Sequence, residues 1–174
     1  MKMIPLITLL IPLLSYSQIN LTDSNLKVGD TIPPGISSTL FHPSDGEINI
    51  SSLDKKLVIL DFWAAWCSPC VAALPKLDSI QREFEGHIQI IPITYQRATD
   101  IRAIVAKAFK NRETILPMVI EDNTYRHLFP HRSLPHTVWL DREGRVLAIT
   151  DGSEINGENI RLLLKAGMRK GGQS

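Results

Sequence analysis

The sequence predicts an α/β fold in which a central mixed sheet is flanked by helices and preceded by a β-hairpin. Residues 57–60 form a continuous apolar run, which suits a strand that is covered on both faces. Residues 71–85 and 100–110 repeat apolar side chains at helical spacing and alternate with strand-like segments. With 174 residues, 44% of them hydrophobic and 21% charged, the chain is long enough for one domain and an extension.

The first residues have the form of a secretory signal peptide, which we expect to span residues 1–17. A basic residue is followed by an apolar stretch over residues 4–14 and by small residues ahead of a cut before Gln18. The stretch is short for a membrane span, and a retained membrane anchor is the alternative. We therefore expect an exported, periplasmic protein whose folded domain covers residues 18–174.

Polar and turn residues organise the segment before the first buried strand. Residues 18–34 are mixed in character and are expected to form an arm laid on the surface. Residues 36–41 and 48–50 predict the two strands of a hairpin, because Asp45-Gly46 between them is a typical turn sequence.

The central strand, residues 56–62, leads to the only two cysteines, Cys67 and Cys70, at the start of the helix predicted over residues 71–85. Pro69 between the cysteines is typical of a helix start. A Cys-x-x-Cys turn at this place predicts a thiol–disulfide redox site, because a helix N-terminus favours a thiolate over a thiol. We expect Cys67 to be the more exposed cysteine and Cys70 to lie covered in the first helical turn.

Other uses of the two cysteines fit the sequence less well. A structural disulfide would close a loop of only four residues, which removes little entropy from the unfolded state. A zinc site usually needs four ligands, and no second cysteine pair completes one. His127 and His131 are interpreted as solvent-facing loop residues, so no metal is expected. Two buried, inert thiols remain a further alternative.

The later elements alternate between strand and helix. Residues 88–94 predict a strand in which Pro92 lies at an edge or a bulge, because proline cannot donate to a ladder. The helix over residues 100–110 is expected to be capped by Thr99 or Asp100. The remaining expectations are a short strand at residues 118–120, a short helix at 123–129, a hairpin between the strand after Pro135 and residues 146–149, a helix at 156–166 and a frayed tail at 167–174.

The segment Asp61-Phe-Trp-Ala-Ala-Trp-Cys-Ser-Pro-Cys70 resembles the active-site segment of thioredoxin. The flanking segments are more similar to the exported TlpA-like thioredoxin family, and residues 26–33 resemble the first segment of TlpA-like and peroxiredoxin-like domains. The resemblance implies a thioredoxin-like sandwich with an N-terminal hairpin. It also implies a thiol–disulfide oxidoreductase, in which Cys67 is the nucleophile and Cys70 resolves the mixed disulfide.

Asp61 matches the buried aspartate of thioredoxin, which handles protons for the second cysteine. An acid in a buried strand is costly unless it is paired or protonated, and the simpler alternative is that Asp61 ends the strand at the surface. TlpA-like proteins more often have asparagine there. Many also have a glutamate three residues after the second cysteine, where this chain has Ala73. Both differences place more of the proton chemistry on Asp61.

The resemblance also places a substrate-docking region around Pro135, which is implied to be a cis proline facing the cysteine pair. Leu134 would pair through its backbone with an extended client segment, and Trp66 would lie against the same segment. His136 stands where the family often has threonine. It could influence the choice of substrate or simply face solvent.

The predicted function is therefore an exported thiol–disulfide oxidoreductase that reduces exported cysteine-containing proteins. No cofactor is needed, since the dithiol is itself the redox carrier. The TlpA-like resemblance implies clients such as those of cytochrome c biogenesis, and a membrane-bound thiol electron donor. The net charge of +1 and the lack of a basic run exclude an obvious nucleic-acid surface. The alternatives are a non-catalytic metal carrier and a peroxiredoxin-type thiol peroxidase, whose Pro-x-x-x-Thr-x-x-Cys pattern does not precede Cys67.

Overall fold

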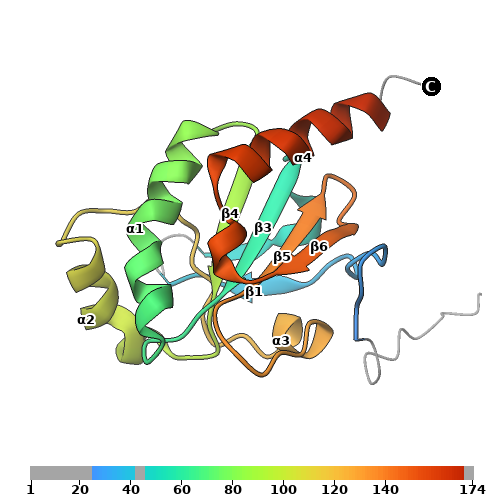
Figure 1. Cartoon of the computed structure of the whole chain (residues 1–174). Coiled ribbons are helices and arrows are strands. Elements are labelled where there is room, and N and C mark those ends of the chain that lie inside the picture. Colours follow the sequence, from blue (N-terminus) through green and yellow to red (C-terminus); the bar gives the residue numbers. More distant parts are fainter. Residues whose placement is uncertain (1–24, 42–45, 171–174) are drawn as a thin grey trace, which may run out of the picture.

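A computed structural model describes residues 25–41 and 46–170 (Figure 1). The signal peptide predicted for residues 1–17 and the turn residue Asp45 lie outside these ranges, so both remain predictions. Within the described ranges, no helix combines the length and the apolar character needed to cross a membrane.

Four strands form the central sheet, in the order β4-β3-β5-β6. Strand β3 (Leu57–Phe62) pairs in parallel with β4 (Ile88–Ile93) and antiparallel with β5 (His136–Asp141), and β5 pairs antiparallel with β6 (Val146–Thr150). All six residues of β3 are buried, as the apolar run predicts for a strand covered on both faces. Pro92 lies on β4, the outer strand of this sheet, as expected for a residue that cannot donate to a ladder.

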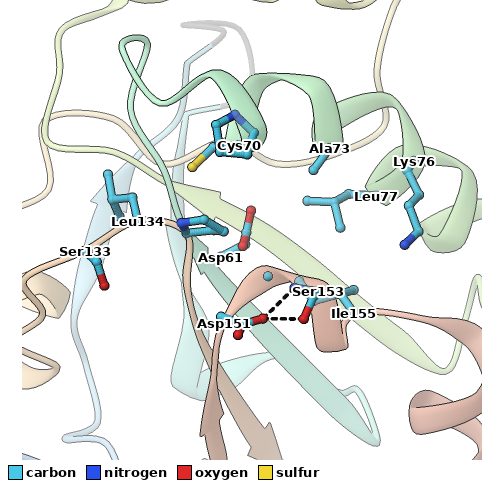
Figure 2. A pocket seen from close by; sticks show the side chains of 13 residues that line it. Asp61, Cys70, Ala73, Lys76, Leu77, Ser133, Leu134, Asp151, Ser153 and Ile155 are labelled. Atoms are coloured by element: carbon cyan, nitrogen blue, oxygen red, sulfur yellow. Dashed lines mark hydrogen bonds between the residues drawn. The ribbon is translucent and has the colours of Figure 1, made fainter.

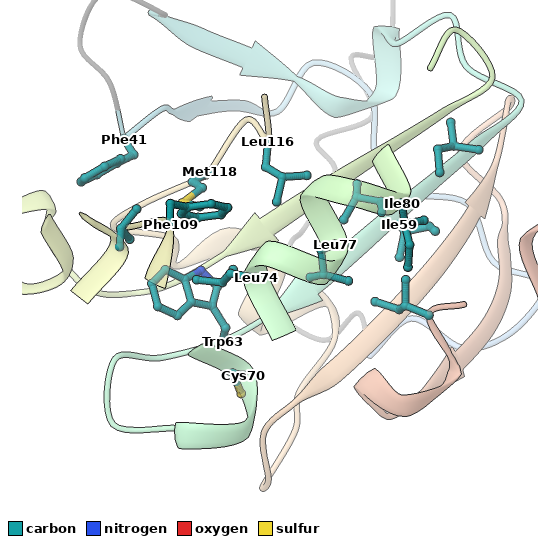
Figure 3. Packing of buried hydrophobic residues seen from close by; sticks show 14 of the residues in the cluster. Phe41, Ile59, Trp63, Cys70, Leu74, Leu77, Ile80, Phe109, Leu116 and Met118 are labelled. Carbon is teal, nitrogen blue, oxygen red and sulfur yellow. The ribbon is translucent and has the colours of Figure 1, made fainter. Parts of the chain in front are cut away.

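The alternation of side chains along β3 divides the core into two clusters. Leu57 and Ile59 belong to the cluster covered by α1 (Ser68–Glu83), α2 (Ala98–Ala108) and α4 (Gly157–Lys170). Figure 3 shows Leu74, Leu77 and Ile80 of α1 packed on this side, together with Ile59. Val58 and Leu60 belong to the opposite cluster, which includes Tyr125 and Leu128 of α3 (Thr124–Leu128). Asp61 follows the alternation, and its side chain therefore points to the α1 side.

The predicted hairpin is present, and β1 (Ser37–Thr39) pairs antiparallel with β2 (Glu47–Asn49). The short 3-10 turn η3 (Ile50–Ser52) follows it and leads to β3. The arm before the hairpin lies along β6, where Gly29 N–H donates to Val146 O (2.8 Å) and Val146 N–H donates to Asp30 O (2.8 Å). The arm therefore covers backbone groups that β6 would otherwise expose at the edge of the sheet.

Helix boundaries differ from the predicted ones. Helix α1 begins at Ser68 and not at residue 71, because Cys67 is the N-cap and Pro69 fits the first turn, where its missing N–H is not needed. The prediction that Thr99 or Asp100 caps α2 is wrong, since Arg97 is the N-cap. The carboxylate of Asp100 instead accepts a bond from Arg97 N–H (3.4 Å), as the third residue of a helix does in a capping box.

One predicted strand and the predicted tail also differ from the structure. Residues 118–120 do not form a regular strand. Val119 instead forms isolated β-bridges with Leu40 and with Ile93. The tail predicted from residue 167 is wrong in part, because α4 continues to Lys170. The 3-10 turn η4 (Gly152–Glu154) connects β6 to α4 and brings Gly152 against Pro135.

Candidate active site

Three segments meet at one end of the sheet: the C-terminal end of β3, the N-terminus of α1 and the loop that enters β5 (Figure 1). The pairing explains why. Because β5 runs antiparallel to β3, its first residue, His136, lies opposite Phe62, the last residue of β3. Pro135 is therefore delivered next to the segment that carries the two cysteines, although 64 residues of chain lie between it and Cys70.

Cys67 and Cys70 form a disulfide, with their Cα atoms 5.3 Å apart. As the N-cap of α1, Cys67 has its Sγ 3.4 Å from the N–H of Cys70, which donates to it, while Val71 N–H donates to Cys67 O at 3.0 Å. Sulfur at this position faces free helix N–H groups, which stabilise negative charge. The exposed fractions are 4% for Cys67 and 1% for Cys70. Cys67 is therefore the more exposed cysteine, as predicted, but both residues are buried in the disulfide form.

Trp66 is an exposed residue directly before the cysteine pair, with 65% of its surface accessible. Its Nε1–H donates to the hydroxyl of Tyr95 at 2.8 Å. Beside it, Ala65 N–H donates to Oε1 of Gln96 at 2.6 Å. The guanidinium of Arg126 in α3 lies 4.9 Å from the centre of the Tyr95 ring. Tyr95 and Gln96, which follow β4, thus hold Trp66 and Ala65 in place before Cys67.

Asp61 is buried, with an exposed fraction of 2%, so the simpler expectation that it ends the strand at the surface is wrong. Thr137 on the neighbouring strand donates its hydroxyl to Asp61 Oδ1 at 3.3 Å. Burial raises the pKa of Asp61 from 3.8 to about 7, and the bond from Thr137 only partly opposes this effect. A carboxyl that titrates near neutral pH can both accept and return a proton, which is the property required of a general acid–base group.

A cavity of about 520 Å³ joins Asp61 to the second cysteine. Figure 2 shows the Asp61 carboxyl group directed into this cavity, with Cys70 on the opposite wall. Helix α1 contributes Ala73, Lys76 and Leu77 to the lining. The rest of the lining comes from Pro69, Ser133, Leu134, Pro135, Asp151, Gly152, Ser153 and Ile155. The cavity is open enough to hold water next to both groups.

The Leu134–Pro135 peptide bond is cis, as the family resemblance implied. Gly152 lies against the Pro135 ring, and a Cβ atom there would be 2.8 Å from Pro135 Cγ and 3.9 Å from Asp61 Oδ1. Glycine is therefore required for this close approach. Among the described residues, the backbone N–H and C=O of Leu134 have no hydrogen-bond partner. Those groups are available to an extended chain laid beside the loop.

A second hollow, of about 240 Å³, lies on the other side of this loop, since Ser133 and Leu134 line both. It contains the exposed aromatic residues Trp66 and Tyr95 and two exposed arginines, Arg126 and Arg132. The remaining lining residues are Phe62, Trp63, Ile93, Asp122 and His131.

The histidines divide into two environments. His127 is exposed, as expected, but His131 is half-buried and stacks on His136 with ring centres 4.7 Å apart, so its expected solvent-facing position is wrong. Both rings lie against Phe62, whose ring centre is 4.9 Å from that of His131 and 5.6 Å from that of His136. Burial, and secondarily the neighbouring His131, lowers the pKa of His136 to about 4. His136 is therefore neutral at physiological pH.

The chain is similar to known proteins. A model of the thioredoxin family matches residues 44–107. Thioredoxin C-2 of Corynebacterium nephridii is 32% identical over 92 residues, which cover 48% of this chain and 85% of that thioredoxin. The chain belongs to the thioredoxin family. Within this family it is a thiol–disulfide oxidoreductase, as its cysteine spacing predicts.

Thioredoxin-family similarity extends beyond the segment around the cysteines. The thiol–disulfide oxidoreductase ResA of Oceanobacillus iheyensis is 25% identical over 139 residues, 77% of this chain and 71% of ResA. The exposed lipoprotein thioredoxin of Streptococcus pneumoniae has a similar fold, with a TM-score of 0.58 and 24% identity over 75% of this chain and 98% of that one. The predicted thioredoxin-like fold, with its mixed sheet and N-terminal hairpin, is confirmed.

Several residues of the site were not predicted. Lys76 follows Cys70 by six residues and Ala73 by three, so helical spacing could have placed it in the cavity. Tyr95 follows β4, whose C-terminal end lies beside that of β3 because the two strands are parallel. That arrangement could have placed Tyr95 near Trp66. Gly152 gives no signal in the sequence, because its role depends on a contact with Pro135.

Proposed function

We propose that this thiol–disulfide oxidoreductase acts outside the cytoplasm as a reductase of disulfides in exported cysteine-containing proteins. The observation that carries the redox part is the cysteine pair at the N-terminus of α1, joined by one cavity to a buried acid and to Pro135. The form of residues 1–17 supports export. The relationship to a thioredoxin that is named an exposed lipoprotein supports the same location.

Docking is proposed to place an extended client segment along the Leu134–Pro135 loop. Leu134 would use its two unpaired backbone groups to bond the client main chain, as an added strand does. Pro135 adds no N–H of its own and lines the same cavity as Cys70. Trp66, which is exposed and fixed by its bond to Tyr95, would cover the client on the other side of the sulfur atoms.

Attack begins with the reduced protein, in which Cys67 is the thiolate. Its sulfur bonds to one sulfur of the client disulfide and the client S–S bond breaks. The second client sulfur leaves with the electron pair and takes up a proton. The free N–H groups of α1 stabilise the negative charge on Cys67 before the attack. The product of this step is a disulfide between Cys67 and the client.

Resolution then needs the Cys70 thiol to lose its proton in a buried place. Asp61 accepts that proton across the cavity, either directly or through a water molecule. The Cys70 thiolate attacks the sulfur of Cys67, the bond between Cys67 and the client sulfur breaks, and that client sulfur leaves with the electron pair and takes up a proton. The Cys67–Cys70 disulfide remains. Two electrons have passed from the protein to the client, and no cofactor takes part. We propose that a membrane-bound thiol electron donor restores the dithiol.

Trapping of the mixed disulfide tests the assignment of Cys67 and Cys70. The variant Cys70→Ser keeps the attacking thiol but lacks the resolving one, so expression in the native host should yield client adducts on non-reducing gels that disappear after reduction. The variant Cys67→Ser should give few adducts, because Cys70 is more deeply buried and faces the cavity. Both variants should lose more than about a thousandfold of disulfide reductase activity.

Equal trapping by the two variants would show that the roles are assigned wrongly. A wild-type protein that reduces no protein disulfide in vitro, combined with no adducts from either variant, would overturn the proposal as a whole. Fractionation of the same host cells tests the location, because adducts should be found only outside the cytoplasm.

A further inference from the structure

The hollow beside Trp66 is positively charged, because two arginines line it. The main-chain pairing proposed for docking does not require this charge. We call the hollow the basic groove and define it by Trp66, Tyr95, Arg126 and Arg132, which all line it. All four side chains are exposed. The groove shares Leu134 with the proposed docking loop, so a client segment that pairs with this residue would lie beside the groove.

Both arginines of the groove are without an acidic partner in the described part of the chain. Five other arginines form ion pairs there, namely Arg82, Arg97, Arg142, Arg145 and Arg161. Arg126 is positioned by the face of Tyr95, and Arg132 has no bond to another described side chain. An arginine stacked on a ring keeps the N–H groups at its edge free, and these are suited to a carboxylate.

The only acid that lines the groove is directed away from it. Asp122 has an exposed fraction of 6%, and its carboxylate accepts bonds from the backbone N–H groups of Thr124, Tyr125 and Arg126 at 3.0 to 3.1 Å. Burial raises the pKa of Asp122, so burial also works against its negative charge. A ligand in the groove therefore meets two exposed positive charges and no exposed negative one from the lining residues.

A chain of contacts links the positive charge to the residue before Cys67. Arg126 contacts Tyr95, Tyr95 accepts the bond from Trp66, and Trp66 directly precedes Cys67. We propose that the basic groove selects client segments that carry glutamate or aspartate next to the cysteine that Cys67 attacks. This inference rests on the proposed function, since it names the class of client for the same site. Exposed charges of this kind mainly raise the rate of encounter and sharpen the choice of partner.

Peptides with one activated cysteine provide a direct test. Three peptides of equal length carry a single cysteine as a disulfide with 2-thiopyridine, and its neighbours are glutamate, glutamine or lysine. Cys67 of the reduced protein attacks the peptide sulfur and pyridine-2-thione leaves with the proton. Cys70 then attacks Cys67 and releases the peptide thiol, so the protein dithiol is oxidised and the peptide disulfide is reduced. Dividing each rate constant by that of dithiothreitol with the same peptide removes differences in intrinsic reactivity.

The normalised rate constant should be about tenfold higher for the glutamate peptide than for the glutamine peptide at low ionic strength, and lowest for the lysine peptide. Because the groups are exposed, this preference should fall to about twofold in high salt. The variant Arg132→Gln should lower the preference to about threefold, and the double variant Arg126→Gln, Arg132→Gln should nearly abolish it.

A matched control is available on α2. Arg102 also lies over an aromatic ring, that of Phe41 at 5.5 Å, but it lies outside the groove. Arg102→Gln removes the same charge and should keep the tenfold preference. Equal rates for the glutamate and glutamine peptides, or the same loss of preference in Arg102→Gln, would overturn the inference while leaving the proposed function intact. Failure of the protein to react with the glutamine peptide at all would overturn the proposed function itself.

Discussion

The two sides of the Leu134–Pro135 loop differ in burial and in charge. On one side is the cavity of Asp61 and Cys70, in which the functional acid is 2% exposed. On the other side is the basic groove, in which Trp66 is 65% exposed. A buried group can have its proton affinity shifted by its surroundings, whereas an exposed group can meet a large partner. Under the proposed function, a single loop therefore lies between the cavity for proton transfer and the groove for docking.

This separation has a kinetic consequence. A change on the cavity side affects steps that follow formation of the mixed disulfide, so it should lower kcat. A change on the groove side affects how well the client is placed before attack, so it should raise KM. Substitutions on each side can therefore test whether the two sides act independently.

The largest effect in the cavity is expected from Asp61→Asn. Asparagine keeps the size of the side chain but cannot accept the Cys70 proton, so kcat at neutral pH should fall by about ten- to a hundredfold while KM stays nearly constant. In the wild type, kcat should rise with pH through about 7, as Asp61 loses its proton. That step should be missing from the pH profile of the variant. An unchanged profile would show that Asp61 takes no part in resolution.

Stability measurements on Asp61→Asn provide the matching control for folding. The folded-state pKa of Asp61, about 7, lies above the ordinary value of 3.8, so the native state binds the proton more tightly than the unfolded state does. The cost of the buried charge therefore appears as pH rises from about 4 to 7 and stays constant above that. The variant lacks this cost, and its free energy of unfolding should exceed that of the wild type by up to about 4 kcal/mol above pH 7. Near pH 4 the two should be similar.

Gly152→Ala tests how closely the loop and the cavity depend on each other. The added methyl group would lie 2.8 Å from Pro135 Cγ, so the proline ring or the η4 turn must move. We expect kcat to fall about fivefold and the protein to lose about 1–3 kcal/mol of stability. Gly157→Ala is the matched control, because its methyl group would meet only the flexible end of Arg161 at 3.0 Å. A similar loss of activity in both variants would exclude a specific role for the contact with Pro135.

Sequence reasoning predicted the elements whose signals are local. The apolar run of β3, the period of α1 and the cysteine pair at its N-terminus each follow from adjacent residues, and the structure places them as expected. Helix starts were predicted less well. At α2, both Thr99 and Asp100 are good caps by residue type, and the hydrogen bond between Arg97 and Asp100 decides the boundary.

The parts of the site that depend on distant contacts could not be predicted from the sequence. The strand pattern allowed Asp61 to be either buried or exposed, and only the packing of α1 and β5 over it decides the question. The stacking of His131 on His136 likewise depends on the path of the loop between them. The cis form of the Leu134–Pro135 bond was inferred from the family resemblance, because local sequence rarely determines it.

The smallest expected effect is on the groove side, where Tyr95→Phe removes only the hydroxyl group that accepts the Trp66 Nε1–H. The phenylalanine ring can still pack against Arg126, so the charge of the groove is kept. An exposed hydrogen bond of this kind contributes about 0.5–1 kcal/mol, which corresponds to an increase in KM of about two- to fivefold. Because Trp66 is expected to act before the sulfur atoms react, kcat should remain within about twofold of the wild type. Steady-state kinetics with a disulfide peptide, performed beside Asp61→Asn, would show the contrast directly. A fall in kcat with constant KM in Tyr95→Phe would mean that Trp66 also positions the cysteine pair, and the two sides of the loop would then not be independent.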